Sequence, residues 1–538
     1  MEERIAVNQV GYAVHQSKRA FSRSPLASAT LVDVKTKAVV FDQGELSQRF
    51  DPLLQDTVFQ WEFTKFKRPG EYKVVADGAS SVAFRISDGV YREIFTLAAR
   101  SYYLQRCGEA IHDPVTGVAH PVCHNRLATV LETGDLRDVA GGWHDAGDYG
   151  RYMQTAGVST GQLLLLAEMA PDTVAEVRLA LSDARIRWPD LWTEVAYELE
   201  WMFKMQRDDG AVYHKVNTDR FCAMVLPQED TEPLWVYDVA TPDTAIFAAS
   251  MARAARVLRP LDQAYAERAL AAALRAWKFL ATTGPLLHPE NGHTGAYLTQ
   301  SDRDERLWAA AELWLTTGDE PYRDYVENNW QMVLGDPAKP LSGINWEDVS
   351  TLVPVALSLD PARSGEALWR RAQAHLLRNA ERLLQQIRQH GYEVALEASE
   401  YVWASAKAAV AHGLNLAVAH RLSGRKEFLD AALAQWNFVL GANALSQSWL
   451  TGAGEASTRH PHNRYVVASG ILIPGLLAGG PNANGYRQDH RAPKTVGPLA
   501  YIDDDEAFSV NENAIDYNAP LVVLSAYLNE VRLSQTSG

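Results

Sequence analysis

Two aspartates stand three positions apart in the run GGWHDAGDYGRY, residues 141–152. A glycine between Asp145 and Asp148 frees the backbone, so both carboxylates can approach one water molecule or one cation. Three aromatic side chains that suit stacking against sugar rings flank the pair: Trp143, Tyr149 and Tyr152. The same residues also fit a solvated loop in which Asp148 caps a helix beginning near residue 149.

A second group of residues beside this run consists of soft and borderline metal ligands. Cys107, Cys123, His124 and His144 form the pattern C-x15-C-H-x19-H. Tetrahedral Zn²⁺ selects such thiolate and imidazole ligands, and a closed four-ligand site would be structural. Two core cysteines and two incidental histidines are the alternative, because this spacing matches no zinc-finger pattern.

A third group is acidic and opens an expected helix in SDRDERLW, residues 301–308. Asp302, Asp304 and Glu305 either complement the dipole of that helix or serve as oxygen ligands of Ca²⁺. Calcium needs six to eight oxygens, so the second interpretation requires backbone carbonyls or a distant acid such as Asp348.

A further carboxylate precedes the last apolar helix, in SVNENAIDYNAP. Glu512 is either a helix cap or a proton donor, the latter if its surroundings raise its pKa. The 364 positions between Asp148 and Glu512 mean that only the fold can bring these two acids together.

The chain that must position these groups has two regions, which differ in the period of their hydrophobic residues. Residues 1–88 show short alternating runs and the hairpin signal Asp77-Gly78, which predict a small β-sandwich. Residues 89–538 have a helical period, with about twelve helices, no convincing strands and several long loops. The absence of a fixed sequence repeat favours a closed ring of six helical hairpins over a solenoid.

The composition excludes several classes of partner. The 538 residues include 51 Lys and Arg against 66 Asp and Glu, a formal net charge of −15, with no basic run. We therefore expect neither nucleic acid nor a membrane as a partner. The N-terminal sequence lacks the pattern of a secretory signal, which predicts a cytoplasmic protein unless a signal has been removed, and we expect a monomer. Three cysteines are too few for a disulfide framework.

Several separated motifs, in a constant order, carry a resemblance to a known family. They are VNQVGY, RSYYLQRCG, GGWHDAGDYGRY, DERLWAAAELWLTTGD, EYVWASAKAAVAHGLNLAVAHRLSG, LGANALSQSWLTGAGE with HPHNR, and SVNENAIDYNAP. Together they resemble glycoside hydrolase family 9, in particular its bacterial cellulases with an N-terminal Ig-like module. The resemblance implies an Ig-like β-sandwich followed by a large all-α (α/α)6 barrel whose open cleft is formed by loops at one end.

The resemblance also implies roles for the acids. Asp148 corresponds to the general base, Asp145 to a residue that helps to hold the attacking water, and Glu512 to the general acid. Such a pair cleaves the glycosidic bond by a single displacement with inversion, and needs carboxyl groups roughly 6.5–9.5 Å apart to leave room for water.

Further positions match residues that bind sugar or metal in the family. His462 and Arg464 match residues that bind sugar hydroxyls, although Asn463 stands where the family often has a second histidine. Trp403 matches an aromatic platform, and Ala406 replaces an asparagine whose polar contact would be lost. Structural zinc is implied at Cys107, Cys123, His124 and His144, and calcium at Asp304 and Glu305.

Other aromatic residues are candidates for lining the cleft, or else ordinary core residues: Trp346, Tyr213 and Tyr517. We expect an endo-acting β-1,4-glucanase that hydrolyses cellulose-type glucans and cello-oligosaccharides. The alternatives are an exo-acting enzyme releasing glucose or glucosamine from short oligosaccharides and, from another class, a non-catalytic carbohydrate-binding protein. We expect the Ig-like module to support the barrel.

Overall fold

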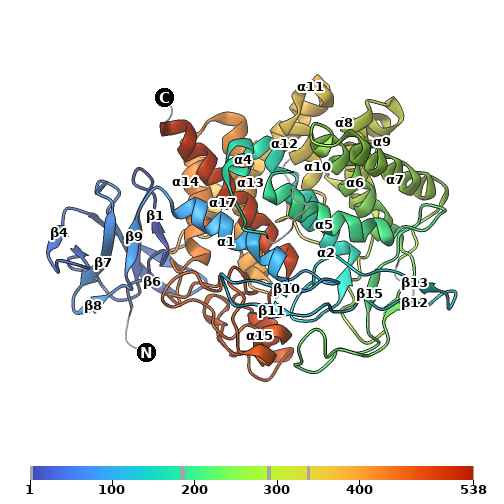
Figure 1. Ribbon diagram of the computed structural model, residues 1–538. Helices are drawn as coiled ribbons and strands as arrows, with labels where there is room; N and C mark the ends of the chain where they lie inside the picture. Colours follow the sequence, from blue (N-terminus) through green and yellow to red (C-terminus); the bar gives the residue numbers. More distant parts are fainter. Residues whose placement is uncertain (1–3, 182–187, 288–291, 336–339, 537–538) are drawn as a thin grey trace.

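The N-terminal domain is a sandwich of two β-sheets that share one hydrophobic core (Figure 1). The computed structural model describes residues 4–181, 188–287, 292–335 and 340–536. The first sheet contains, in spatial order, β1 (Gly11–Tyr12), β9 (Phe84–Ile86), β7 (Gly70–Ala76), β3 (Thr30–Asp33) and β4 (Val39–Phe41), with β8 (Ala79–Ser80) paired to β7. The second contains β2 (Arg19–Ser22), β6 (Asp56–Glu62) and β5 (Glu45–Asp51). This arrangement confirms the expected Ig-like class.

Twelve long helices follow and form two concentric rings in the part of the chain that the structure describes. The inner ring consists of α2 (Met153–Leu163), α6 (Thr241–Leu258), α8 (Arg303–Thr317), α10 (Leu352–Leu359), α13 (Ser405–Ser423) and α17 (Ile515–Thr536). Each inner helix contacts the next, and α17 contacts α2, so the ring closes. The outer helices are α1 (Val90–Leu104), α5 (Asp190–Lys204), α7 (Gln263–Thr282), α9 (Glu320–Val333), α12 (Glu366–Ile387) and α14 (Lys426–Val439). The (α/α)6 barrel is therefore confirmed.

The helices of the two rings differ in burial, and their sequences differ accordingly. The inner helices α6 and α13 are rich in alanine and buried on nearly all sides, which lets neighbouring helices approach closely. The outer helices α7 and α12 bury one stripe and expose the other face. Because α17 closes against α1 and α2, the C-terminal motif returns to the loop that precedes α2.

The expectation of no strands after residue 88 is wrong. Seven short strands lie in the loops of the barrel: β10 (Ile111–His112), β11 (Ala119–His120), β12 (Ala128–Val130), β13 (Leu136–Arg137), β14 (Arg151–Tyr152), β15 (Lys215–Asn217) and β16 (Trp235–Val236). Strands of two or three residues are too short to show alternation in sequence. Short helices also occur between the long ones: α3 (Leu166–Met169), α4 (Pro171–Glu176), α11 (Pro361–Ser364), α15 (Arg464–Ser469) and α16 (Phe508–Asn511), with 3-10 turns at 398–400, 485–487 and 497–499.

The β-sandwich packs against the barrel through polar and apolar contacts. Gln9 donates from its backbone to the carbonyl of Leu440 at 2.9 Å, and its side chain bonds two further barrel loops. The ring of Phe21 packs on Tyr392 with centroids 5.4 Å apart. Phe21 belongs to the hydrophobic core of the barrel, so the two domains share buried surface.

No described helix combines the length and the apolar character needed to cross a membrane.

Candidate active site

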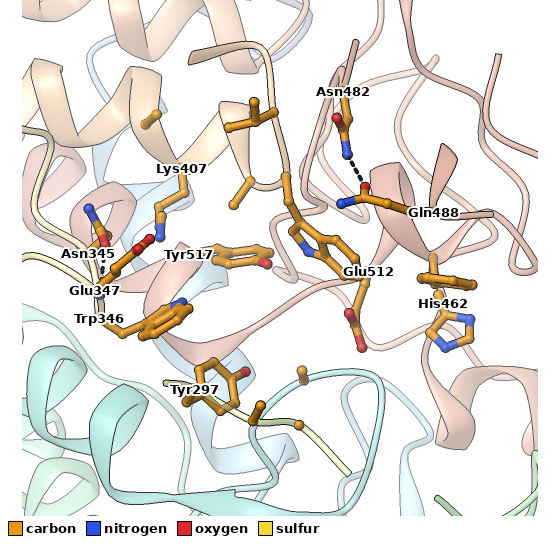
Figure 2. Close-up of a pocket in the computed structure, with 18 of the residues that line it drawn as sticks. Tyr297, Asn345, Trp346, Glu347, Lys407, His462, Asn482, Gln488, Glu512 and Tyr517 are labelled. Atoms are coloured by element: carbon orange, nitrogen blue, oxygen red, sulfur yellow. Dashed lines mark hydrogen bonds between the residues drawn. The ribbon is translucent and has the colours of Figure 1, made fainter. Parts of the chain in front are cut away.

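A large cleft lies at the end of the barrel where the long loops gather. Its volume is about 870 Å³, within the range of ligand-binding pockets. The acids Asp148 and Glu512 both line it. Figure 2 shows Glu512 in the cavity with the aromatic residues Tyr297, Trp346 and Tyr517, which come from distant segments. The fold thus brings together the two carboxylates that the sequence places 364 positions apart.

A direct contact joins the loop of Asp148 to Glu512. The backbone N–H of Gly147 donates to Oε1 of Glu512 at 3.2 Å, and the carbonyl of Gly147 accepts from the backbone of Arg464 at 3.0 Å. A Cβ at position 147 would lie 2.3 Å from the carbonyl oxygen of His462, closer than real contacts allow. The glycine therefore permits close approach of three chain segments as well as freedom of the loop.

The two acids have different electrostatic surroundings. Burial, and then the negative charge of Asp148, raise the pKa of Glu512 to about 8. Asp148 instead accepts three hydrogen bonds at Oδ2, from the backbone of Gly150 and the side chains of Tyr152 and Asn217. Donors of this kind stabilise an ionised carboxylate. Near neutral pH, the surroundings favour a protonated Glu512, which lies in the same cleft as the hydrogen-bonded carboxylate of Asp148.

Asp145 lies behind the wall of the cleft. Its side chain is fully buried, and it is absent from the residues that line the cavity. The hydroxyl of Tyr297 donates a hydrogen bond to its carboxylate. Burial, and then the charge of Asp148, raise the pKa of Asp145 well above its ordinary value. The structure therefore places Asp145 beside the cleft, bonded to Tyr297 of its wall, with Oδ1 left without a hydrogen-bond partner among the described residues.

Three of the candidate aromatic residues line the cleft, and one does not. Tyr517 lies in the wall near Glu512, and Trp346 lies further along it (Figure 2). Trp403 also lines the cavity, and its ring packs against Phe508 with centroids 5.8 Å apart. Tyr213 is buried in the core with the guanidinium of Arg137 5.2 Å from its ring. The expectation for Tyr213 is therefore wrong, because a backbone bridge to residue 239 fixes it within the sheet region outside the cleft.

His462 and Arg464 also line the cleft, and both are held by backbone groups. Nδ1 of His462 donates to the carbonyl of Asp505 at 2.6 Å, which leaves Nε2 as the acceptor of a neutral ring. Burial lowers the pKa of His462. Arg464 donates from Nη1 to the carbonyl of Gly147 at 2.8 Å and from Nε to that of Cys222 at 3.0 Å. The arginine thus braces the loop of Asp148.

Asn463, the departure from the family pattern, has a structural role. Its Oδ1 accepts from the backbone of Val466 at 3.2 Å and caps α15, while its Nδ2 donates to Asn513 at 3.1 Å. It therefore links the helix after His462 to the segment that carries Glu512.

Sequence reasoning missed two residues of the cleft, Tyr297 and Phe221, and a third, Asn217, that bonds to Asp148. Tyr297 packs edge-on against Trp346, with centroids 5.0 Å apart, and also bonds to Asp145. Phe221 is about half exposed beside Arg464, and Asn217 holds Asp148. Phe221 and Tyr297 lie in irregular loops and Asn217 lies in a strand of three residues, so no periodicity or motif distinguished them.

Comparison with known proteins agrees with this geometry. The profile of "Glycosyl hydrolase family 9" matches residues 91–525, and that of "Cellulase N-terminal ig-like domain" matches residues 1–81. The chain belongs to glycosyl hydrolase family 9. It is accordingly a glycoside hydrolase that cleaves β-1,4-glucans with inversion, as the family does. The family assignment supports an enzyme rather than the non-catalytic carbohydrate-binding protein.

Relatives in the family cover nearly the whole chain. Endoglucanase D of Acetivibrio thermocellus is 31% identical over 98% of this chain and 84% of its own length. A cellodextrinase of Butyrivibrio fibrisolvens is 31% identical over 97% of this chain and 98% of its own length. The crystal structure of a metagenome-derived family 9 endoglucanase superposes with a TM-score of 0.93 and 39% identity, covering 98% of this chain and 99% of that one.

The family 9 barrel also contains a cluster that could hold a metal ion. Cys107, Cys123, His124 and His144 are all buried, and their ligand atoms lie within 4.8 Å of one another. Nε2 of His124 lies 3.2 Å from Oδ2 of Asp230, whereas its Nδ1 has no hydrogen-bond partner in the described structure. A buried nitrogen without a partner, in a set of four convergent ligands, fits a bound cation.

The acidic residues near α8 are only partly brought together. Asp302 forms an ion pair with Arg306 at 2.7 Å and so is already neutralised. Both carboxylate oxygens of Glu305 are buried without a hydrogen-bond partner among the described residues, and burial followed by the charge of Asp304 raises its pKa well above the ordinary value. Burial raises the pKa of Asp304, and the nearby charge of Asp348 raises it further.

Proposed function

We propose that this enzyme cleaves β-1,4-glucans with Asp148 as the general base and Glu512 as the general acid. The observation that carries this proposal is the contrast between the two acids in one cleft. Burial, and then the charge of Asp148, raise the pKa of Glu512 to about 8, whereas Asp148 accepts three hydrogen bonds at one oxygen. Asp148 polarises a water molecule that attacks the anomeric carbon, and Glu512 protonates the leaving oxygen. Asp145 helps to hold that water with its unpartnered oxygen, while its other oxygen accepts a hydrogen bond from Tyr297.

The substrate is held by aromatic surfaces and by polar groups near the point of cleavage. Trp403, Tyr517 and Trp346 line the cleft and offer stacking faces to successive sugar rings. Nε2 of His462 accepts a hydrogen bond from a sugar hydroxyl. Arg464 donates hydrogen bonds to the sugar and also holds the loop of Asp148 through the carbonyl of Gly147.

Substitution of each acid tests this assignment. Asp148→Asn and Glu512→Gln preserve side-chain volume, and each should reduce the kcat for cellopentaose by about 10²–10⁴-fold with little change in melting temperature. Polarimetry or NMR of the first product should show the inverted anomer. A variant that folds normally and keeps more than a tenth of the wild-type kcat would contradict the role of its acid.

We favour endo-action, since an endoglucanase is structurally similar over almost the entire chain. Exo-action on short oligosaccharides is the second candidate, because the cellodextrinase of Butyrivibrio fibrisolvens matches over 98% of its own length. An endo-acting enzyme lowers the viscosity of carboxymethylcellulose before much reducing sugar appears. Release of reducing sugar without loss of viscosity would favour the second candidate.

We propose a structural zinc ion at the cluster of Cys107, Cys123, His124 and His144. Two sulfur and two nitrogen ligands are a donor set typical of closed zinc sites. Asp230 holds the outer nitrogen of His124, which orients the ring for coordination. The ion would fix residues 107–144, and with them the start of the loop that carries Asp148.

We also propose calcium near the start of α8, with Asp304 and Glu305 as the protein carboxylates and Asp348 close by. Buried carboxylate oxygens without partners need a proton or a cation, and hard oxygen ligands suit Ca²⁺. Asp302 is omitted from this set because Arg306 neutralises it.

A further inference from the structure

Asp148 is held by a network that leaves its two oxygens unequal. The Tyr152 hydroxyl donates to Oδ2 at 2.9 Å, and Nδ2 of Asn217 donates to the same oxygen at 3.1 Å. Nδ2 of Asn217 also donates to the Tyr152 hydroxyl at 2.6 Å. The backbone N–H of Gly150 completes the set at 3.0 Å. Among the described residues, every hydrogen bond to this carboxylate ends on Oδ2, so Oδ1 remains for water.

The backbone fixes the orientation of both donors. Tyr152 lies in β14 and Asn217 in β15, and these strands pair in antiparallel register. The backbone N–H of Thr218 donates to Oδ1 of Asn217 at 2.8 Å, which turns its amide nitrogen toward Asp148. A Cβ on Gly150 would lie 2.4 Å from that nitrogen, so the close packing requires glycine there.

We propose that Tyr152 and Asn217 are positioning residues that clamp Oδ2 of Asp148 and direct Oδ1 into the cleft. This inference rests on the proposed role of Asp148 as the base. The Tyr152 hydroxyl donates one hydrogen bond to Asp148 and accepts one from Asn217, so its orientation is fixed by both partners. The clamp would therefore fix the direction of water attack and support ionisation of the base.

Several charged or titratable groups also affect Asp148 and must be considered in any pH experiment. They are Glu512, Asp145, Lys215, His462 and Cys222. Of these, Lys215 is buried on β15 next to the clamp, and burial lowers its pKa to about 8. These groups are unchanged in the variants below. A difference between the pH profiles of variant and wild type therefore reports the substituted donor.

Tyr152→Phe removes one donor and keeps the ring. We expect kcat for cellopentaose to fall about 10- to 100-fold with KM nearly unchanged. The acidic limb of the kcat/KM profile should move to higher pH by about one unit, because ionisation of the base loses a stabilising hydrogen bond. Asn217→Asp places a second carboxylate against Oδ2 and should move the same limb further in the same direction.

Tyr237→Phe is the matched control. Its hydroxyl donates to the carbonyl of Thr218 at 3.3 Å, next to Asn217, and its ring lies 4.4 Å from Nζ of Lys215. This variant should leave the acidic limb in place. If Tyr152→Phe and Asn217→Asp also leave it in place, the clamp is refuted, even where activity or melting temperature falls. If Asp148→Asn remains active, the proposed base itself is wrong, so the two failures are distinguishable.

Discussion

At the scale of single residues, burial and then the charge of Asp148 keep Glu512 protonated by raising its pKa. The two carboxyls share a cleft, and ionisation of both would place two negative charges in a poorly solvated space. The two acids have different environments. Burial disfavours a negative charge on Glu512, whereas Asp148 accepts three hydrogen bonds. Inverting hydrolysis needs this division of one acid and one base.

A pH dependence follows from the raised pKa of Glu512. As pH rises through about 8, Glu512 loses the proton that the leaving oxygen needs, so kcat/KM should fall about tenfold for each further unit. The measurement is kcat/KM for cellopentaose between pH 5 and 10, with circular dichroism as the control for folding. A basic limb at pH 6 or below would contradict the pKa assigned to Glu512.

At the scale of elements, the segment between α1 and α2 positions the base. It contains all four thiol and imidazole groups of the cluster, and His144 stands four positions before Asp148. The preceding α1 and the closing helix α17 are in contact, which brings the segment of Glu512 to the same loop. A metal at the cluster would therefore stabilise the segment and the catalytic loop together.

Loss of a metal ligand should show this coupling. Cys123→Ser should reduce bound zinc by about one equivalent, measured by plasma mass spectrometry. It should also lower the melting temperature by on the order of 5–10 °C and reduce kcat. Cys222→Ser is the matched control, since its thiol lies outside the cluster, and it should keep the zinc. Full zinc content in Cys123→Ser would overturn the assignment of this ligand.

At the scale of the whole molecule, the β-sandwich is part of the barrel's support. Phe21 is buried in the barrel core, and Asp51 accepts a hydrogen bond from the backbone of Gly391 at 2.8 Å. Arg19 forms an ion pair with Glu393 at 2.7 Å. Gly391 and Glu393 lie in the loop that follows α12. Figure 1 shows the sandwich at one side of the barrel.

Removal of this support should destabilise the barrel. Deletion of residues 1–88 exposes apolar surface and should lower solubility or melting temperature. Gln9→Ala in the full chain should cost about 1 kcal/mol of unfolding free energy, because it leaves partly buried backbone groups of Ser446 and Ala456 without their partner. Gln48→Ala, on an exposed face of β5, is the control. An unchanged melting temperature in the deletion variant would refute the supporting role.

The sequence alone determined the two domains' classes and the positions of the long helices. The changes from period 2 to period 3.6 are local and repeat over many residues, so α7 and α12 could be recognised without their partners. The motifs also identified Asp148 and Glu512. The short strands β14 and β15 gave no such signal, because two or three residues cannot show a period.

The tertiary structure alone decided which side chains face the cleft. Tyr213 and Tyr297 are both tyrosines in irregular segments, yet the first lies under Arg137 and the second lines the cavity. It likewise paired Asn217 with Asp148, 69 positions away in sequence. Local sequence sets the conformation of a segment, whereas the direction of a loop side chain depends on contacts with distant segments. Closure of the helical ring creates those contacts.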